Sequence, residues 1–339
     1  METNQHKPAV IVKKILQTCL ALSSKISNNP MKIINFLILS LLVLTVSCKS
    51  KIDKITKKKI HKIEVHGHRG ERGNLPENSI EAFLGALHKG VNVLELDIVI
   101  SKDRKVLVSH EPFMSSVYMS KPSGEPINKD EERNFNLYQM DYDSIRIFDG
   151  GSRGNYKFPK QQKLKTYKPL LSEVFNVIET EIKNNNLEQV KYNIEIKSAE
   201  DVSDVYLPQP DDFVNLVMQI IIENNMEHRI NIQSFDPTIL KILHKKYPEI
   251  EIAYLVSKGN IQNNLKYLDF RPNIYSPNFK LISNQQSVDS LKVMGIKVIP
   301  WTVNEEEDIK KQIELQVDGI ITDYPERVII QCKSITQQN

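Results

Sequence analysis

Cysteine is scarce in this sequence, and neither sign of charge is in clear excess. The 339 residues contain three cysteines, Cys19, Cys48 and Cys332, which are too few and too scattered for a disulfide framework or a cysteine-ligated zinc site. The 45 basic and 42 acidic residues give a formal net charge of only +3. A chain this balanced gives no indication of a nucleic-acid partner, and nothing in the composition indicates a protein partner.

The sequence also lacks an apolar run long enough to span a membrane. Its most apolar stretch, residues 33–46, would extend roughly 21 Å as a helix, against a hydrocarbon core of about 30 Å. This stretch follows Met31 and Lys32, so it is typical of the apolar region of a signal peptide. It ends in "LTVSC", which resembles a bacterial lipobox with Thr45 in place of the usual leucine, and this predicts a lipid on Cys48. An uncleaved anchor and an ordinary secretory signal are the alternatives.

We therefore interpret residues 1–62 as a leader followed by a tether. Because residues 1–30 have no place before a signal peptide, we expect translation to begin at Met31. Seven lysines lie between Cys48 and Ile63, so the tether is expected to run close to anionic lipid head groups. The predicted location is the bacterial cell envelope, either lipid-anchored or periplasmic or secreted.

From residue 63 onward, short β-branched segments alternate with amphipathic ones. This alternation predicts parallel strands joined by crossover helices. Eight such pairs predict an α/β fold of the (β/α)8 TIM-barrel type over residues 63–332, with a doubly wound open sheet as the alternative. The expected strands are 63–67, 93–99, 192–196, 230–234, 251–256, 274–276, 297–301 and 319–322. The expected helices are 79–89, 172–183, 212–224, 237–247, 260–267, 284–294, 305–316 and 325–332.

One segment interrupts this alternation. Strand 93–99 continues into a predicted hairpin, "VISKDRKVLVSH", and residues 111–168 then form an insertion rich in Pro, Gly and polar residues. Insertions of this length in compact domains are usually functional or disordered. Because the insertion leaves from the end of the second strand, we expect it to cap the pocket at the catalytic rim.

Two of the expected strands contain carboxylates two residues from another polar side chain. Because side chains alternate along a strand, Glu95 and Asp97 share one face, as do Glu195 and Lys197. Carboxylates on the inward face of a barrel are costly unless something neutralises them. The three carboxylates therefore predict a divalent cation, Ca²⁺, Mg²⁺ or Mn²⁺, since all-oxygen ligation favours hard ions. Ion pairs with lysines at the strand ends are the alternative.

Two histidines are expected at the same rim of the barrel. His68 ends the first strand and His110 ends the hairpin, and imidazole titrates near neutral pH, so the pair fits general acid and general base. Arg69 and Lys197 add the positive charge that a phosphate needs. His66 lies one layer deeper and is expected to support the site from below.

The segment "PENS" after this turn predicts the start of a helix. Asn78 as N-cap with Glu81 three residues later resembles a capping box, and Ser79 is the alternative cap.

These segments together resemble the successive motifs of the glycerophosphodiester phosphodiesterase family. The resemblance runs in the correct order from about residue 64 to 330 and rests on "GHRG…LPENSIEAF", "LELDIVISKD…VLVSHEP", "NIEIK", "QSFDP", "IPWTVN" and "VDGIITDYP". It implies a (β/α)8 barrel that uses a divalent cation to hydrolyse glycerophosphodiesters to an alcohol and glycerol 3-phosphate.

The resemblance also implies roles for particular residues. It gives His68 and His110 as the acid–base pair, Glu95, Asp97 and Glu195 as metal ligands, and Arg69, Lys197 and Trp301 as substrate contacts. Trp301 would lie near the glycerol, and an inward core position is its alternative. The family commonly has His-Asp where this chain has His110 and Glu111, which puts an essential role for that acid in doubt.

Three functions are compatible with these features. The first is hydrolysis of deacylated phospholipid head groups such as glycerophosphocholine. The second is a lysophospholipase D or sphingomyelinase D-like activity, which a membrane tether favours and a closing polar cap disfavours. The third is a binding module without catalysis, but such a module would be expected to have lost one of the histidines or carboxylates, and all five are present.

Overall fold

The computed structural model describes residues 63–198 and 204–338. The leader, Cys48 and the tether lie outside the described residues, so the predictions about them stay predictions. Among the residues that are described, none of the helices combines the length and apolarity that crossing a membrane requires.

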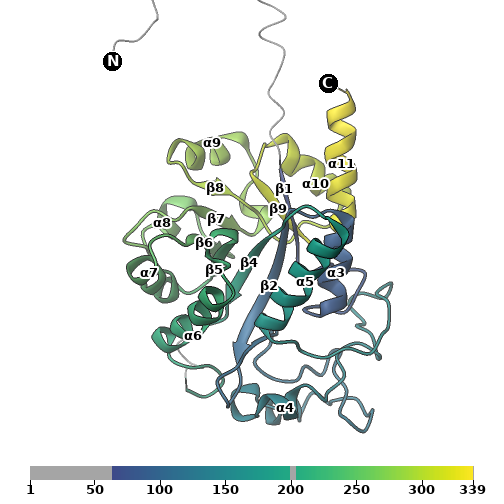
Figure 1. Cartoon of the computed structure of the whole chain (residues 1–339). Helices are drawn as coiled ribbons and strands as arrows, with labels where there is room; N and C mark the ends of the chain where they lie inside the picture. The colour runs from purple at the N-terminus through teal and green to yellow at the C-terminus, as the bar shows by residue number, and fades with distance from the viewer. Residues whose placement is uncertain (1–62, 199–203, 339) are drawn as a thin grey trace, which may run out of the picture. The chain divides into compact units, whose positions relative to one another are not determined.

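Eight parallel strands form the sheet predicted by the alternating pattern (Figure 1). Their order is β8-β7-β6-β5-β4-β2-β1-β9, and β3 pairs antiparallel with β2 as the predicted hairpin. The strands are β1 Glu64–Gly67, β2 Val93–Ile100, β3 Val106–Val108, β4 Lys191–Ile196, β5 Ile230–Ser234, β6 Glu251–Val256, β7 Ile274–Pro277, β8 Lys297–Val298 and β9 Gly319–Thr322.

Backbone hydrogen bonds between β8, its continuation and β9 close the sheet. Asp318 donates to the carbonyl of Val298 at 2.8 Å, and Ile321 donates to that of Pro300 at 3.0 Å. These bonds join the two end strands, so the fold is the predicted (β/α)8 barrel and not an open doubly wound sheet. The strand at 297–301 is shorter than predicted because Pro300 has no N–H to donate to the ladder.

Helices follow the strands and cover the outside of the barrel (Figure 1). In α3, for example, Ala82, Phe83 and Leu87 are buried on one face, as the period of 3.6 residues requires. The helices are α3 Ile80–Lys89, α4 Tyr142–Ile145, α5 Leu171–Asn185, α6 Pro210–Glu223, α7 Pro237–Lys246, α8 Ile261–Leu265, α9 Gln285–Val293, α10 Glu306–Glu314 and α11 Pro325–Gln338.

The insertion at residues 111–168 is a packed structure. It contains α4 and the 3₁₀ turns Glu132–Asn134 and Leu137–Gln139, and it buries Met114, Ile127 and Phe148 in the main core. Burial of each such side chain stabilises the fold by about 1.5–3 kcal/mol. The insertion therefore has a fixed place beside the carboxyl end of β2, where it begins and ends (Figure 1).

Candidate active site

The turn after β1 brings two side chains to the carboxyl end of the barrel. At Gly67 a Cβ would meet the carbonyl oxygen of Gly70 at 2.3 Å, and Gly70 has φ +84° against Ala82. Glycine is therefore required at both positions. The turn aims His68 into the pocket and lets the backbone N–H of Arg69 donate to Glu95 Oε2 at 2.8 Å.

The three predicted carboxylates meet below this turn. Glu95, Asp97 and Glu195 are buried, and one oxygen from each lies within 4.8 Å of the others. Lys197 Nζ lies 2.7 Å from Glu195 Oε1 and 3.0 Å from Asp97 Oδ1, and Arg69 Nε lies 3.1 Å from Asp97 Oδ2. The ion pairs that the sequence offered as an alternative are therefore present beside the carboxylate cluster.

These contacts do not neutralise the cluster. Burial and the neighbouring carboxylates raise the pKa of Glu95 well above its usual value, and burial also raises the pKa of Glu195. Although burial acts in the opposite direction, Lys197 and Arg69 hold the pKa of Asp97 well below its usual value. Two of the three acids are thus penalised when ionised, and a cation among them would remove that penalty.

The donor set fits a hard divalent cation. All three groups offer carboxylate oxygens that lie close together, and oxygen atoms are the ligands that Ca²⁺ and Mg²⁺ prefer. The three carboxylates also outnumber the two cations that contact them. A phosphodiester anion entering this pocket needs further positive charge, and a bound cation would supply it.

His68 is held from the opposite side by Asp323, the residue after β9. His68 Nδ1 lies 2.6 Å from Asp323 Oδ1, and His68 Nε2 lies 3.9 Å from Glu95 Oε2. Asp323 also accepts hydrogen bonds from Arg72 Nε at 3.0 Å and from Asn304 Nδ2 at 2.7 Å. Burial and the charge of Arg72 lower the pKa of His68 to about 4.

His110 is held more loosely by the start of the insertion. Its Nδ1 lies 3.1 Å from Glu111 Oε1, and the Tyr118 hydroxyl donates to Glu111 Oε2 at 3.1 Å. Lys168 is buried nearby and donates to Ser109 Oγ at 2.7 Å, and burial lowers the pKa of this lysine.

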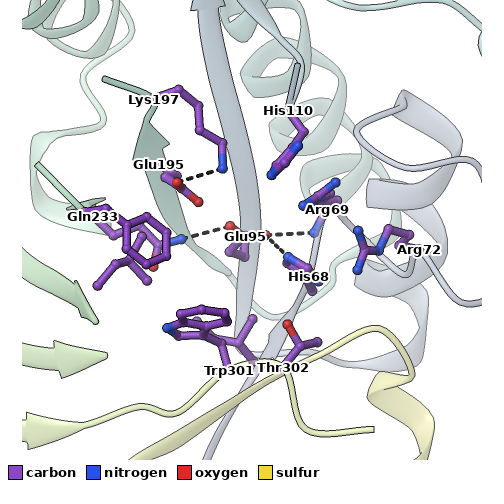
Figure 2. Close-up of a pocket in the computed structure, with 13 residues that line it drawn as sticks. His68, Arg69, Arg72, Glu95, His110, Glu195, Lys197, Gln233, Trp301 and Thr302 are labelled. Carbon is purple, nitrogen blue, oxygen red and sulfur yellow. Dashed lines mark hydrogen bonds and ion pairs between the residues drawn. The ribbon is translucent and has the colours of Figure 1, made fainter. Parts of the chain in front are cut away.

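A cavity of about 280 Å³ opens between the two histidines (Figure 2). Seven of the eight residues predicted for the site line it, and Asp97 lies below, fully buried. Trp301 forms part of the wall, where its Nε1 donates to the carbonyl of Ser276 at 2.8 Å and its ring meets Phe235 edge-on at 5.4 Å. His66 is buried one layer deeper, as predicted, and contacts Glu64 and Asn193.

Several residues of the site were missed from the sequence. Arg72 and Gln233 line the cavity, and Gln233 Nε2 donates to Glu95 Oε1 at 2.8 Å. Gln233 could have been found, because Asn231 and Gln233 alternate on β5 as the carboxylates do on β2. The pairing of Asp323 with His68 has no local signal, since 255 positions separate them.

The assignment of Asn78 as the N-cap of α3 was wrong. Ser79 is the cap, with its hydroxyl accepting from the N–H of Ala82 at 3.1 Å. Asn78 has a positive φ of 55°, and its Nδ2 donates to Asp97 Oδ2 at 2.9 Å. The side chain of Asn78 therefore orients the Asp97 carboxylate, and Ser79 caps the helix.

Comparison with known proteins gives consistent matches over the barrel. The model of the glycerophosphoryl diester phosphodiesterase family matches residues 68–327. A glycerophosphodiester phosphodiesterase of Caldanaerobacter subterraneus is 32% identical over 268 residues, which cover 78% of this chain and 96% of that protein.

Solved structures share the fold. A crystal structure from Silicibacter pomeroyi, described as a candidate glycerophosphoryl diester phosphodiesterase, superposes with a TM-score of 0.72 at 26% identity and covers 80% of this chain and 94% of its own. A phosphodiesterase of Oleispira antarctica, solved with the product sn-glycerol-3-phosphate, has a TM-score of 0.61 at 21% identity, over 80% of this chain and 96% of its own.

Proposed function

The chain belongs to the glycerophosphoryl diester phosphodiesterase family and is a phosphoric diester hydrolase, and on this basis we propose how its own residues act. The reaction is hydrolysis of glycerophosphodiesters to an alcohol and glycerol 3-phosphate, assisted by a divalent cation and two histidines. The observation that carries this proposal is the cluster of three buried carboxylates between His68 and His110.

The carboxylates provide the metal site of this proposal. Glu95, Asp97 and Glu195 would hold a Ca²⁺, Mg²⁺ or Mn²⁺ ion, which supplies positive charge to the phosphate and lowers the pKa of the attacking hydroxyl. Asn78 and Gln233 keep two of these carboxylates oriented through their side-chain amides.

The histidines provide the proton transfers. The attacking group is either water or the 2-hydroxyl of the glycerol; it must lose a proton, and the leaving alkoxide must gain one. Attack by the 2-hydroxyl gives a cyclic phosphate, which water then opens to glycerol 3-phosphate. Because Asp323 accepts from His68 Nδ1, that ring leaves Nε2 directed toward the pocket. Glu111 acts on Nδ1 of His110 in the same way. One ring removes a proton while the other donates one, which is worth about 10²–10⁴ in rate.

The remaining predicted residues bind the substrate. Arg69 and Lys197 line the cavity and place fixed positive charge beside the phosphate. Trp301 offers its ring to the glycerol from the wall of the cavity.

The test is product analysis with the purified protein and glycerophosphocholine. We expect glycerol 3-phosphate and choline, loss of activity after exhaustive EDTA treatment, and recovery with Ca²⁺, Mg²⁺ or Mn²⁺. Glu195→Gln should weaken cation binding in calorimetry while the fold is kept, because it relieves repulsion among buried carboxylates. Glu251→Gln, at the opposite end of the barrel on β6, is the matched control. Full activity in EDTA would refute the metal site.

A membrane-lipid substrate is the second candidate. Phe235 lines the cavity and is 41% exposed, and Leu255, Ile321 and Trp301 add to its apolar wall. This apolar mouth could receive an acyl chain, as a lysophospholipase D or a sphingomyelinase D-like enzyme requires. Adding lysophosphatidylcholine to the same assay distinguishes the two: release of choline from it faster than from glycerophosphocholine supports this candidate.

We also propose the domain organisation and location predicted from the sequence. Residues 1–62 act as leader and lysine-rich tether, Cys48 carries a lipid in the bacterial cell envelope, and residues 111–168 cap the pocket. Support for the anchor comes from the apolar stretch that ends at Cys48. Cys48→Ala should release the protein from the membrane fraction, and unchanged fractionation and gel mobility would refute the anchor.

A further inference from the structure

The last part of the insertion is strongly basic. Residues 150–172 contain no aspartate or glutamate and six basic residues: Arg153, Lys157, Lys160, Lys163, Lys165 and Lys168. Lys168 is buried toward Glu111. Within the described part of the chain, the other five form no ion pair with a carboxylate, so this segment carries uncompensated positive charge.

Two of these cations lie on a second cavity. Its volume is about 480 Å³, and its wall includes Arg153 and Lys163, the buried amides of Asn155 and Gln161, and no carboxylate. Arg153 donates to the carbonyl of Ser116, which fixes the guanidinium in the wall. Burial lowers the pKa of this arginine, and among the described residues no carboxylate forms an ion pair with it.

This cavity and the catalytic one share a contact between two of their lining side chains. Arg72 lines the catalytic cavity, and its guanidinium lies over the ring of Phe158, which lines the second cavity, at 4.8 Å from the ring centre. Gln161 also donates to the carbonyl of Arg72 at 2.7 Å. The walls of the two cavities therefore meet at Arg72 and Phe158.

The position of Arg72 suggests how the departing alcohol could extend from the catalytic cavity toward the second one. In Figure 2, His68 lies between Trp301 and Arg72. If the glycerol is bound on the Trp301 side, as in the proposed function, the other alcohol of the phosphodiester extends past His68 toward Arg72. An alcohol long enough to pass Arg72 would reach the cavity that Arg153 and Lys163 line.

We propose that the second cavity is an anion subsite for a phosphate carried by the leaving alcohol. Preferred substrates are then glycerophosphodiesters whose alcohol bears a second phosphate group. This inference rests on the proposed function. Its physical basis is charge: a phosphate meets two cations and two amide groups there, whereas an uncharged or cationic alcohol gains nothing from them.

The experiment compares two substrates, bis(glycerophospho)glycerol and glycerophosphocholine. We expect kcat/KM of the wild-type protein to be at least about tenfold higher for the first, with the preference falling as salt is added. Lys163→Gln should lower this ratio roughly fivefold, the effect of one partly exposed ion pair, and leave glycerophosphocholine within about twofold. Lys165→Gln, the same change on the same segment outside the cavity, should leave the ratio unchanged.

Three results would overturn the subsite while leaving the proposed function intact. They are equal kcat/KM for both substrates, an equal drop with Lys163→Gln and Lys165→Gln, and an unchanged ratio with both variants while both weaken co-sedimentation with phosphatidylglycerol vesicles. The last result would make the segment a lipid-contacting surface. Hydrolysis of neither substrate would overturn the proposed function as well.

Discussion

The two histidines are held by regions of the molecule that differ in origin and in depth. The His68 arm consists of His68, Arg72, Asn304 and Asp323, and it belongs to the barrel between β1 and β9. The His110 arm consists of His110, Glu111, Tyr118 and Lys168. His110 directly precedes the insertion, and the other three belong to it.

The His68 arm is the more enclosed of the two. The side chains of His68 and Asp323 are 12% and 2% exposed, whereas those of His110 and Glu111 are 34% and 25% exposed. The N–H of His68 also donates to the carbonyl of Thr322 at 2.9 Å, so its backbone continues the pairing of β1 with β9. One histidine is therefore fixed by the barrel itself, and the other depends on a segment that can vary in sequence without disturbing the barrel.

The largest expected effect is a loss of kcat that should be similar in the two arms. His68→Ala and His110→Ala should each reduce kcat at least about 10²-fold, since each removes one proton transfer. The double variant should be barely worse than either single variant, because groups that act as a unit are not additive. His66→Ala, one layer deeper, is the control and should cost much less in steady-state kinetics.

Two results would break this equality. A loss below about tenfold for either rim histidine would remove that residue from the reaction. A loss for His66→Ala equal to the other two would mean that burial near the site, and not proton transfer, explains all three.

Substitution of the two supporting acids should have a smaller effect on kcat, and this effect should differ between the arms. Asp323→Asn should reduce kcat about 10- to 100-fold with KM nearly unchanged, because Asp323 is only 2% exposed and solvent there compensates little for the charge that His68 loses. Glu111→Gln should cost less than about fivefold, since the amide oxygen still accepts from Nδ1 and His110 is partly solvated.

Glu111→Asp introduces the acid that the family commonly has at this position, and it is the matched control for that comparison. It should keep near wild-type kcat if the acid only orients the ring. A greater loss for Glu111→Gln than for Asp323→Asn would reverse the ranking and make the insertion the critical support.

The same contrast explains what the sequence could predict. The strands, the crossover helices and the inward-facing Glu95, Asp97 and Glu195 follow from periodicity, which is local, and the structure confirms the barrel that these patterns indicated. The order of the motifs indicated His68 and His110 as well, because His68 directly follows β1 and His110 lies two residues after β3.

The partners of those residues could not be predicted in the same way. Asp323 meets His68 across 255 positions, and Asn78 meets Asp97 through a left-handed backbone conformation that looked like an ordinary helix cap. Both contacts depend on barrel closure and turn geometry, which single-residue patterns do not encode. The structure of the insertion could not be predicted either, because the apolar residues that pack it show no regular spacing in the sequence.

The smallest expected effect is on the free energy of unfolding in acid, which should again differ between the two arms. Although burial acts in the opposite direction, His68 and Arg72 hold the pKa of Asp323 well below its usual value. His110 and Lys168 likewise hold the pKa of Glu111 low against the effect of burial. A carboxyl group whose pKa is depressed by folding stabilises the native state above its unfolded pKa, about 3.9 for aspartate, and loses this contribution as pH falls.

Asp323→Asn should therefore be less stable than wild type at pH 7, and the difference in the free energy of unfolding should shrink by less than about 1 kcal/mol toward pH 3, because His68 gains a proton in the same range and its attraction to Asp323 offsets part of the loss. Glu111→Gln should show the same trend with a smaller change, because solvent screens the more exposed pair. Urea unfolding of the wild type and both variants at pH 7, 5 and 3, with EDTA present so that cation binding does not contribute, measures the difference. If the gap between wild type and Asp323→Asn widens in acid, or if Glu111→Gln shows the steeper trend, the barrel side is not the more tightly coupled of the two arms.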